Sequence, residues 1–369
     1  MNVLFAGGGT GGHLYPALAI ARALVAANPE VKPFFIGAQR GVERTVLPTT
    51  EFPHELLDLH PLYRQRPWQN WRTLRSSTGA WRRISALVDE LRPGALVATG
   101  GYAAGIALAV AARRRVPIVI QEQNSFPGLT VRTFARRAAQ IHLGFPEARA
   151  RLRLGPRTQL FATGNPIEPP PPPGERRLRV DASTAWGFAD PARPVVLVFG
   201  GSQGSAAINA VVAEWLKERE VTRGGVNVIW ATGPSTYDRY AALDAPDVRV
   251  RPYIAPMRDA YSASTLAVTR AGAMTTAELS AWGLPSVLVP LPTAAADHQT
   301  ANARAIAADG AAVMIEQREL TPSTLGNTIH SLLTDERRLD GMRSATLRRA
   351  RPDAAQNIAG HILELLCLK

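Results

Sequence analysis

Three glycine-rich turns are the parts of the sequence best suited to contact a phosphate. They cover Gly7–His13, Gly100–Gly105 and Gly200–Gly204, and each stands between an apolar segment and a helix-like one. Glycine lets backbone N–H groups approach an anion closely, and a helix start adds N–H donors without helical partners. The first turn also matches the dinucleotide pattern G-x-G-x-x-G. In a dinucleotide-binding domain the second strand ends at a carboxylate that holds the ribose. Here the second strand-like segment ends at Gln39 without one, so an NAD-dependent dehydrogenase is disfavoured.

Polar side chains stand where several apolar segments end. His13 lies directly behind the first turn, where a neutral imidazole could take a proton from a hydroxyl nucleophile; a histidine that only satisfies the turn is the alternative. The run Gln121–Asn124 ends another apolar segment, and buried polar groups need partners. Glu278 lies about one turn into a predicted helix, where it could accept both hydroxyls of a ribose or simply favour the helix dipole. Asp297–Gln299 could contact sugar hydroxyls.

Several classes of site are excluded by what the sequence lacks. The single cysteine, Cys367, rules out an internal disulfide framework and a cysteine-built metal site. There is no D-x-D, no cluster with metal-ligand spacing, no P-loop and no G-x-S-x-G elbow. We therefore expect neither a metal ion nor a cofactor.

The elements that position these residues alternate between short apolar strands and longer helices. Continuous apolar strands separated by helices predict parallel sheets covered on both faces. The predicted strands are Val3–Ala6, Pro33–Ile36, Ala95–Thr99, Ile118–Ile120, Ile141–Leu143, Gln159–Ala162, Val195–Phe199, Val226–Ala231, Val248–Tyr253, Leu266–Thr269, Ser286–Val289 and Ala312–Ile315. The second half opens as the first does, with strand, glycine turn and helix. The pattern predicts two doubly wound, Rossmann-like α/β domains that face each other across a cleft.

A run of five prolines, Pro169–Pro173, separates the two halves. Proline does not join helix or sheet interiors, so this run predicts a stiff extended linker. We expect a first domain at 1–163, a linker at 164–178, a second domain at 179–350, and a final helix at 351–369 that packs on the first domain. Uncharged stretches at 1–21 and 94–112 are interrupted by glycines, so we expect neither a signal peptide nor a spanning helix.

Taken together, these motifs resemble the MurG family of UDP-N-acetylglucosamine–N-acetylmuramyl-(pentapeptide) pyrophosphoryl-undecaprenol N-acetylglucosaminyltransferases. They occur in the family's order across nearly the whole chain, which makes the resemblance specific. The matching segments are Gly8–His13, Gly100–Gly105, Glu122–Asn124, Gly164–Pro166, Gly200–Gly204, Ala271–Glu278 and Asp297–Ala303. The resemblance implies the GT-B fold, a metal-independent inverting transfer of N-acetylglucosamine from UDP-N-acetylglucosamine to lipid I, and a peripheral position on the cytoplasmic face of the cell membrane. Contacts with other cell-wall synthesis proteins are a further expectation.

The resemblance also implies roles for individual residues. His13 is the candidate base on the C4 hydroxyl of the acceptor, and Glu122 is the second catalytic candidate. Donor-binding candidates are Thr10, Gly11, Gly12 and Asn124 from the first domain and Ser202, Ile254, Ala273, Met274, Thr275, Glu278 and Gln299 from the second. Among these, Ser202 would contact the diphosphate, the Ile254 backbone would pair with uracil, and Gln299 would bind the sugar hydroxyls. Two positions depart from the family pattern: Gln121 stands where histidine is usual, and Glu168 where arginine is usual.

A basic and aromatic stretch lies between Asp58 and Asp89, where no acidic residue occurs. It contains Trp68, Trp71, Arg64, Arg66, Arg72 and Arg75. Tryptophan with arginine suits an interface with anionic lipid headgroups, and an arginine-rich solvated helix is the alternative. The whole chain carries a net charge of +12, which also suits nucleic acid. We expect a membrane surface and no nucleic acid as the partner of this stretch. The nearest rival function is a UDP-N-acetylglucosamine 2-epimerase, which is disfavoured because it would have no use for the stretch.

Overall fold

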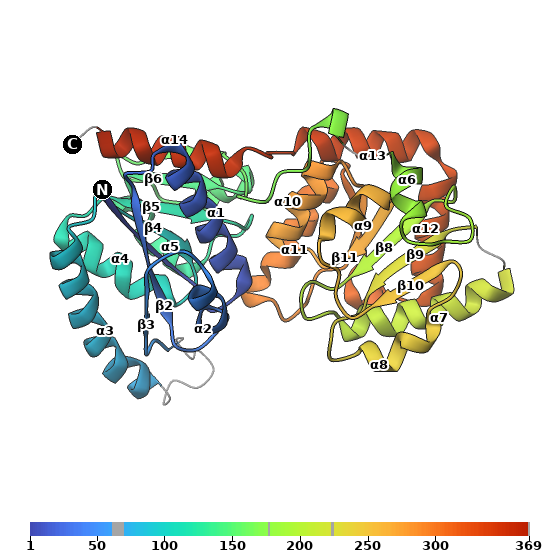
Figure 1. The fold of residues 1–369 in the computed structure, drawn as a ribbon, viewed down its shortest axis with the longest axis horizontal. Coiled ribbons are helices and arrows are strands. Elements are labelled where there is room, and N and C mark those ends of the chain that lie inside the picture. The colour runs from blue at the N-terminus through green and yellow to red at the C-terminus, as the bar shows by residue number, and fades with distance from the viewer. Residues whose placement is uncertain (61–69, 176–177, 223–224, 368–369) are drawn as a thin grey trace. The chain divides into compact units, whose positions relative to one another are not determined.

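The computed structural model describes residues 1–60, 70–175, 178–222 and 225–367, and the chain forms two compact units (Figure 1). Unit 1 comprises Met1–Glu168 and Pro352–Lys369, and unit 2 comprises Pro169–Arg351. The boundary between the units falls at the start of the proline run, and the chain returns to unit 1 only for its last helix.

Unit 1 is built on a sheet of seven parallel strands in the order β3-β2-β1-β4-β5-β6-β7. The strands are β1 (Asn2–Gly7), β2 (Lys32–Ala38), β3 (His54–Leu57), β4 (Ala95–Gly100), β5 (Ile118–Glu122), β6 (Gln140–Leu143) and β7 (Gln159–Phe161). The order reverses between β1 and β4. In doubly wound sheets ligands bind beyond the carboxyl ends of the strands at such a switch point, and the turns after β1 and β4 both lie there.

Helices cover both faces of this sheet because alternate strand residues point to opposite sides. Leu4 and Ala6 join a core beneath α3 (Asn70–Leu91), α4 (Ala103–Arg114) and α5 (Leu129–Phe134). Val3 and Phe5 join a second core beneath α1 (Gly11–Ala27), α2 (Glu43–Val46) and α14 (Ala354–Cys367). The last helix, α14, lies against α1 (Figure 1), and the His361 carbonyl accepts a hydrogen bond from the Gln140 amide at 2.8 Å.

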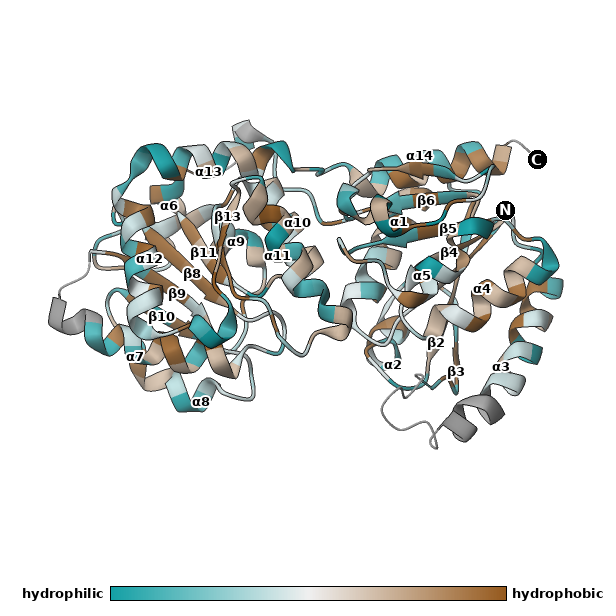
Figure 2. Cartoon of the chain, turned by 180° about the vertical axis from the view of Figure 1, so that it is seen from behind, coloured by the Kyte–Doolittle hydropathy of each residue, from teal (hydrophilic) through white to brown (hydrophobic). Residues whose placement is uncertain are grey.

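Unit 2 has a sheet of six parallel strands in the order β10-β9-β8-β11-β12-β13. The strands are β8 (Val195–Phe199), β9 (Asn227–Ala231), β10 (Val248–Arg251), β11 (Leu266–Thr269), β12 (Ser286–Leu288) and β13 (Ala312–Met314). The helices are α6 (Arg179–Thr184), α7 (Ala206–Thr222), α8 (Tyr237–Tyr240), α9 (Met257–Ala263), α10 (Ala273–Trp282), α11 (His298–Ala308), α12 (Pro322–Thr334) and α13 (Glu336–Arg348). The strands are the most apolar part of the unit, with polar residues on the outer helices (Figure 2).

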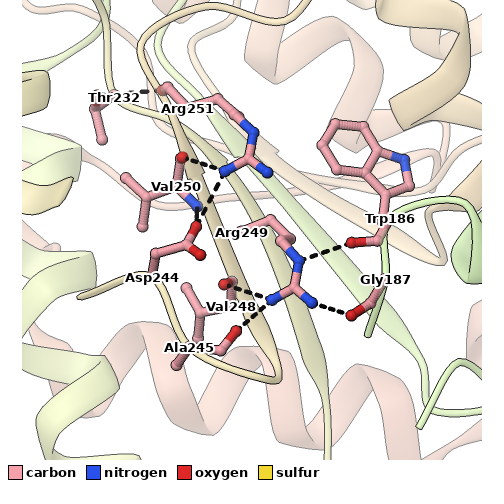
Figure 3. A network of polar contacts seen from close by, with 9 residues as sticks. All are labelled: Trp186, Gly187, Thr232, Asp244, Ala245, Val248, Arg249, Val250 and Arg251. Carbon is pink, nitrogen blue, oxygen red and sulfur yellow. Dashed lines mark hydrogen bonds and ion pairs between the residues drawn. The ribbon is translucent and has the colours of Figure 1, made fainter. Parts of the chain in front are cut away.

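Two arginines fasten the edge strand β10 (Figure 3). Arg249 donates from Nε to the Trp186 carbonyl at 2.7 Å and from its terminal nitrogens to the Gly187 and Ala245 carbonyls. Arg251 pairs with Asp244 at 3.1 Å, and the same carboxylate accepts the Val250 N–H at 2.8 Å. Because β10 is bonded on both sides, the segment that leaves it toward Ile254 starts from a fixed position.

The predicted fold class is confirmed, since both units are doubly wound parallel sheets and together have the GT-B plan. Strand β3 was not predicted. Its sequence, HELL, has two polar residues and only one fully buried position, which is typical of an edge strand. Within the described residues, no helix combines the length and apolar character that crossing a membrane requires.

Candidate active site

His13 stands at the switch point of unit 1, in the first turn of α1. Its backbone N–H bonds to the Thr10 carbonyl at 3.1 Å, and its carbonyl accepts the Thr99 hydroxyl of β4 at 2.7 Å. Its ring nitrogen Nδ1 lies 3.0 Å from the Thr99 carbonyl and 3.1 Å from Oε1 of Gln123. The helix start, β4 and the end of β5 therefore position the imidazole together.

The two glycine turns of unit 1 touch each other beside this histidine. A Cβ added at Gly101 would stand 2.0 Å from the Gly8 carbonyl oxygen, so no larger residue fits there. Gly101 also has a φ of +78°, which L side chains rarely adopt. Thr10 and Gly12 are exposed and Gly11 is half-buried, so this part of the first turn is accessible from solvent.

Glu43 lies beneath the first glycine turn, and the spacing of the sequence did not indicate this contact. Its Oε1 accepts the Gly9 N–H at 2.7 Å, and the side chain is fully buried. A Cβ at Gly8 would stand 1.7 Å from the same oxygen. One N–H of the turn is thus already bonded to a carboxylate of the protein. The glycines here make room for Glu43 as well as for any ligand.

Glu122, at the end of β5, bonds within its own loop. One carboxylate oxygen accepts the Asn124 backbone N–H at 2.9 Å and the other accepts the Gly128 N–H at 2.8 Å. Burial raises the pKa of this carboxyl above its usual value, and the backbone hydrogen bonds oppose that rise. In this arrangement Glu122 holds the loop that carries Asn124, the donor-binding candidate beside it.

In unit 2 the predicted phosphate contacts come from two strand-to-helix turns. Ser202 is exposed in the turn between β8 and α7, where Gly201 and Gly204 have φ of +87° and +75°. After β11, Gly272 precedes α10, and Ala273, Met274 and Thr275 form the first turn of that helix. The first N–H groups of a helix have no helical acceptor and favour an anion.

Glu278, one turn further along α10, is held by Tyr261 of α9. The Tyr261 hydroxyl donates to Oε2 of Glu278 at 2.6 Å. Burial of the phenol raises the pKa of Tyr261 well above its usual value, and the adjacent carboxylate adds to the rise. A hydrogen bond to a charged acceptor is stronger than one to a neutral acceptor. Tyr261 therefore fixes the orientation of the Glu278 carboxylate, the group predicted to bind the ribose.

Arg270, at the end of β11, is a buried cation that the sequence patterns did not single out. Its guanidinium donates to the Val289 and Pro290 carbonyls at 3.1 Å each and to Oε1 of Gln317 at 2.7 Å. All three acceptors are neutral, and burial lowers the pKa of the group. A buried positive charge two residues before the N-cap of α10 suits an anion at that helix start.

The remaining donor candidates lie on neighbouring loops. The Gln299 side chain accepts the Leu291 N–H through Oε1 at 3.0 Å, so its NH₂ group is the part that can donate to a hydroxyl. Ile254 follows β10 and has only 5% of its surface exposed, which leaves its backbone as the polar part.

The membrane-docking candidates cannot be placed in the same way. Arg64, Arg66 and Trp68 lie outside the described residues. Trp71, Arg72 and Arg75 belong to α3, in the part of that helix where only the backbone is described. Among the described residues, no group of three histidine, cysteine, aspartate or glutamate side chains could hold a metal ion.

Both halves of the chain match known protein families. The Glycosyltransferase family 28 N-terminal domain matches residues 3–143, and the Glycosyltransferase family 28 C-terminal domain matches residues 195–358. The chain is 40% identical over 372 residues to a UDP-N-acetylglucosamine--N-acetylmuramyl-(pentapeptide) pyrophosphoryl-undecaprenol N-acetylglucosamine transferase of Chlorobaculum parvum, with 99% of each chain covered. A protein of the same name from Salinibacter ruber is 40% identical over 370 residues, which cover 99% of this chain and 96% of that one.

A solved structure agrees with these sequence matches. The crystal structure of Acinetobacter baumannii MurG superposes with a TM-score of 0.75 at 27% identity, covering 98% of this chain and 99% of that one. Similarity at this level extends over both units and the returning C-terminal helix, since nearly the whole chain is aligned.

Proposed function

The chain belongs to glycosyltransferase family 28, and we infer from its full-length similarity to the MurG relatives that it transfers N-acetylglucosamine from UDP-N-acetylglucosamine to lipid I, giving lipid II. The observation that carries this function is the match of the whole chain to transferases of one name, at identities that show more than a shared fold. The roles of individual residues below are proposals that rest on the geometry of each unit.

We propose that unit 2 binds the donor nucleotide. Glu278 accepts the ribose hydroxyls through a carboxylate that Tyr261 holds in place. The diphosphate lies at the first turn of α10, where helix N–H groups meet the buried charge of Arg270. Arg270 would then supply the positive contact that Glu168 does not provide. Ser202 contacts the diphosphate, the Ile254 backbone pairs with uracil, and Gln299 donates to a sugar hydroxyl.

The chemical step is assigned to His13 of unit 1. The C4 hydroxyl of the muramyl sugar gives its proton to Nε2 of His13 as its oxygen attacks the anomeric carbon of the donor. The bond between that carbon and the β-phosphate oxygen breaks, and UDP leaves with the electron pair. Attack from the face opposite the leaving group inverts the anomeric centre. The α10 N-terminus and Arg270 stabilise the charge that develops on the diphosphate.

The donor assignment is tested by calorimetry with UDP. Glu278→Ala is expected to weaken binding by about 1.5–3 kcal/mol, because a hydrogen bond to a charged carboxylate is lost. Glu214→Ala is a matched control, since Glu214 is an exposed glutamate of the same unit that pairs with Lys217. Equal affinity of Glu278→Ala and the control would remove Glu278 from the ribose site.

The base assignment is tested by turnover with a lipid I analogue. His13→Ala is expected to lower turnover by roughly 10²–10⁴-fold with little change in UDP affinity. His54→Ala is the control, because His54 begins the edge strand β3, whereas His13 follows the carboxyl end of the central strand β1. Near-normal turnover of His13→Ala at saturating acceptor would move the role elsewhere, with Glu122 as the next candidate.

We also propose that the protein is peripheral at the cytoplasmic membrane face, because its acceptor carries an undecaprenyl chain. Replacing Trp68 and Trp71 with serine should reduce cosedimentation with anionic vesicles and spare UDP binding. High salt should act in the same direction, since it screens the contribution of the arginines. Equal sedimentation of variant and parent at both salt concentrations would refute this docking surface.

A further inference from the structure

Three buried carboxamides lead to the ring of His13. Gln121 and Gln123 stand at and just beyond the end of β5, and Asn165 follows β7. All three side chains are buried, and none carries a charge. Gly144 leaves the space that Asn165 fills, because a Cβ there would stand 2.2 Å from Oδ1 of Asn165.

Each amide fixes the orientation of the next one. Nδ2 of Asn165 donates to the Gln123 carbonyl at 3.0 Å, and a carbonyl can only accept. Oδ1 of Asn165 must therefore face Gln121, whose Nε2 donates to it at 3.0 Å. Oε1 of Gln121 in turn accepts from Nε2 of Gln123. The Gln123 backbone carbonyl thus fixes the orientation of the Asn165 amide, and Asn165 fixes that of the Gln121 amide.

The last amide determines which ring nitrogen of His13 carries hydrogen. Nε2 of Gln123 also faces the Thr99 carbonyl at 2.8 Å, so a flipped amide would place oxygen against oxygen. Oε1 of Gln123 is therefore the atom at 3.1 Å from Nδ1 of His13, and the Thr99 carbonyl is the other neighbour at 3.0 Å. Both neighbours only accept, so Nδ1 must donate.

We propose that Gln123 is a positioning residue that, with Gln121 and Asn165, holds neutral His13 as the Nδ1–H tautomer. Nε2 then carries the lone pair that receives the acceptor's proton. The inference rests on the proposed role of His13 as the base. It gives the departure at Gln121 a function: the glutamine performs no acid–base chemistry and instead orients the amide that orients the histidine.

The tautomer is measured directly by nitrogen-15 NMR of the histidine rings in the full chain, with His13→Ala identifying the signal. The parent protein should show a protonated Nδ1 and an unprotonated Nε2 in His13 at neutral to alkaline pH. Gln123→Met should increase the share of the Nε2–H tautomer and lower kcat roughly 10- to 100-fold, with the KM for UDP-N-acetylglucosamine unchanged. Gln121→Met should have a smaller effect, because Nε2 of Gln123 keeps the Thr99 carbonyl.

Gln140→Met is the matched control, since Gln140 is an equally buried glutamine of β6 whose amide bonds to His361 instead. The backbone amide NMR signals of unit 1 and the melting temperature of each variant show whether it is folded. An unchanged tautomer or an unchanged kcat in folded Gln123→Met would overturn the positioning role. If the tautomer shifts as expected but His13→Ala remains active, the base assignment fails while the orientation of the ring stands.

Discussion

His142 is the described residue whose replacement should change the pH dependence of stability most clearly. It lies on β6 with its ring 5.2 Å from that of Phe161 and 5.6 Å from that of His361, in stacked arrangements. Neither ring nitrogen has a hydrogen-bond partner among the described residues. Burial, and then the neighbouring His361, lower the pKa of His142 from 6.5 to about 3. The folded state therefore keeps this ring neutral.

The sign and size of the effect follow from this pKa. Because the folded state binds the proton less readily than the unfolded state, stability is lost as the pH falls from about 6.5 toward about 3. At about pH 5 the unfolded state gains about 2 kcal/mol from protonation, since each pKa unit corresponds to about 1.4 kcal/mol. His142→Phe keeps a stacking ring and removes this loss. It should also add about 1 kcal/mol at neutral pH, because two unsatisfied nitrogens disappear.

The assay must report on unit 1 alone, since two units need not unfold together. Urea titrations in which pulsed hydrogen exchange of peptides from β6 and α14 is the readout satisfy this condition. The stability difference between His142→Phe and the parent protein should grow by about 2 kcal/mol between about pH 7.5 and about pH 5. His54→Phe, at a half-buried position of β3 in the same unit, is the control. Parallel pH profiles of variant and parent would refute the reasoning.

Three further predictions concern the turns and the donor site. Tyr261→Phe should raise the Kd for UDP about fivefold to tenfold, because Glu278 loses the hydroxyl that orients it; an unchanged Kd in calorimetry would contradict this. Arg270→Met should weaken UDP binding about tenfold or more in the same assay, whereas Arg318→Met, at an exposed side chain, should bind normally. Gly8→Ala should lower the stability of unit 1 by about 2–4 kcal/mol, because the new Cβ collides with Glu43. Gly105→Ala, where the new Cβ meets open space, should leave the stability of unit 1 unchanged. Equal urea unfolding midpoints of Gly8→Ala and the parent protein would show that Glu43 can move aside.

The fold was largely predictable because most strands of both sheets are buried on both faces. Such strands form continuous apolar runs, as Val195–Phe199 and Ala95–Thr99 do. Strand β3 escaped prediction because its pairing with β2 depends on register along one edge, and its sequence lacks an apolar run. The helix content near the C-terminus was also predictable from its periodicity, which is pronounced in α12 and α14.

Candidate site residues could be named from the sequence only where their local context is distinctive. His13 follows a glycine turn, and Glu278 lies about one turn into the helix that follows an apolar strand, so both stand out in the sequence. The contacts that orient them do not. Tyr261 reaches Glu278 from another helix, and Gln123 reaches His13 across 110 residues. No sequence motif marks Arg270 as a site candidate either. What marks it is the burial of its charge among neutral acceptors, which only the structure shows.

The return of α14 to unit 1 determines the order in which the protein can be completed during synthesis. Ile358, Ile362 and Leu366 of this helix are buried in the same core as Leu14 and Leu24 of α1. These residues leave the ribosome after all of unit 2. A nascent chain therefore carries an uncovered apolar face on α1 until α14 has been made, and a chain truncated before α14 keeps it. Since His13 lies in the first turn of α1, the helix that carries this candidate base is fully packed only once α14 is in place.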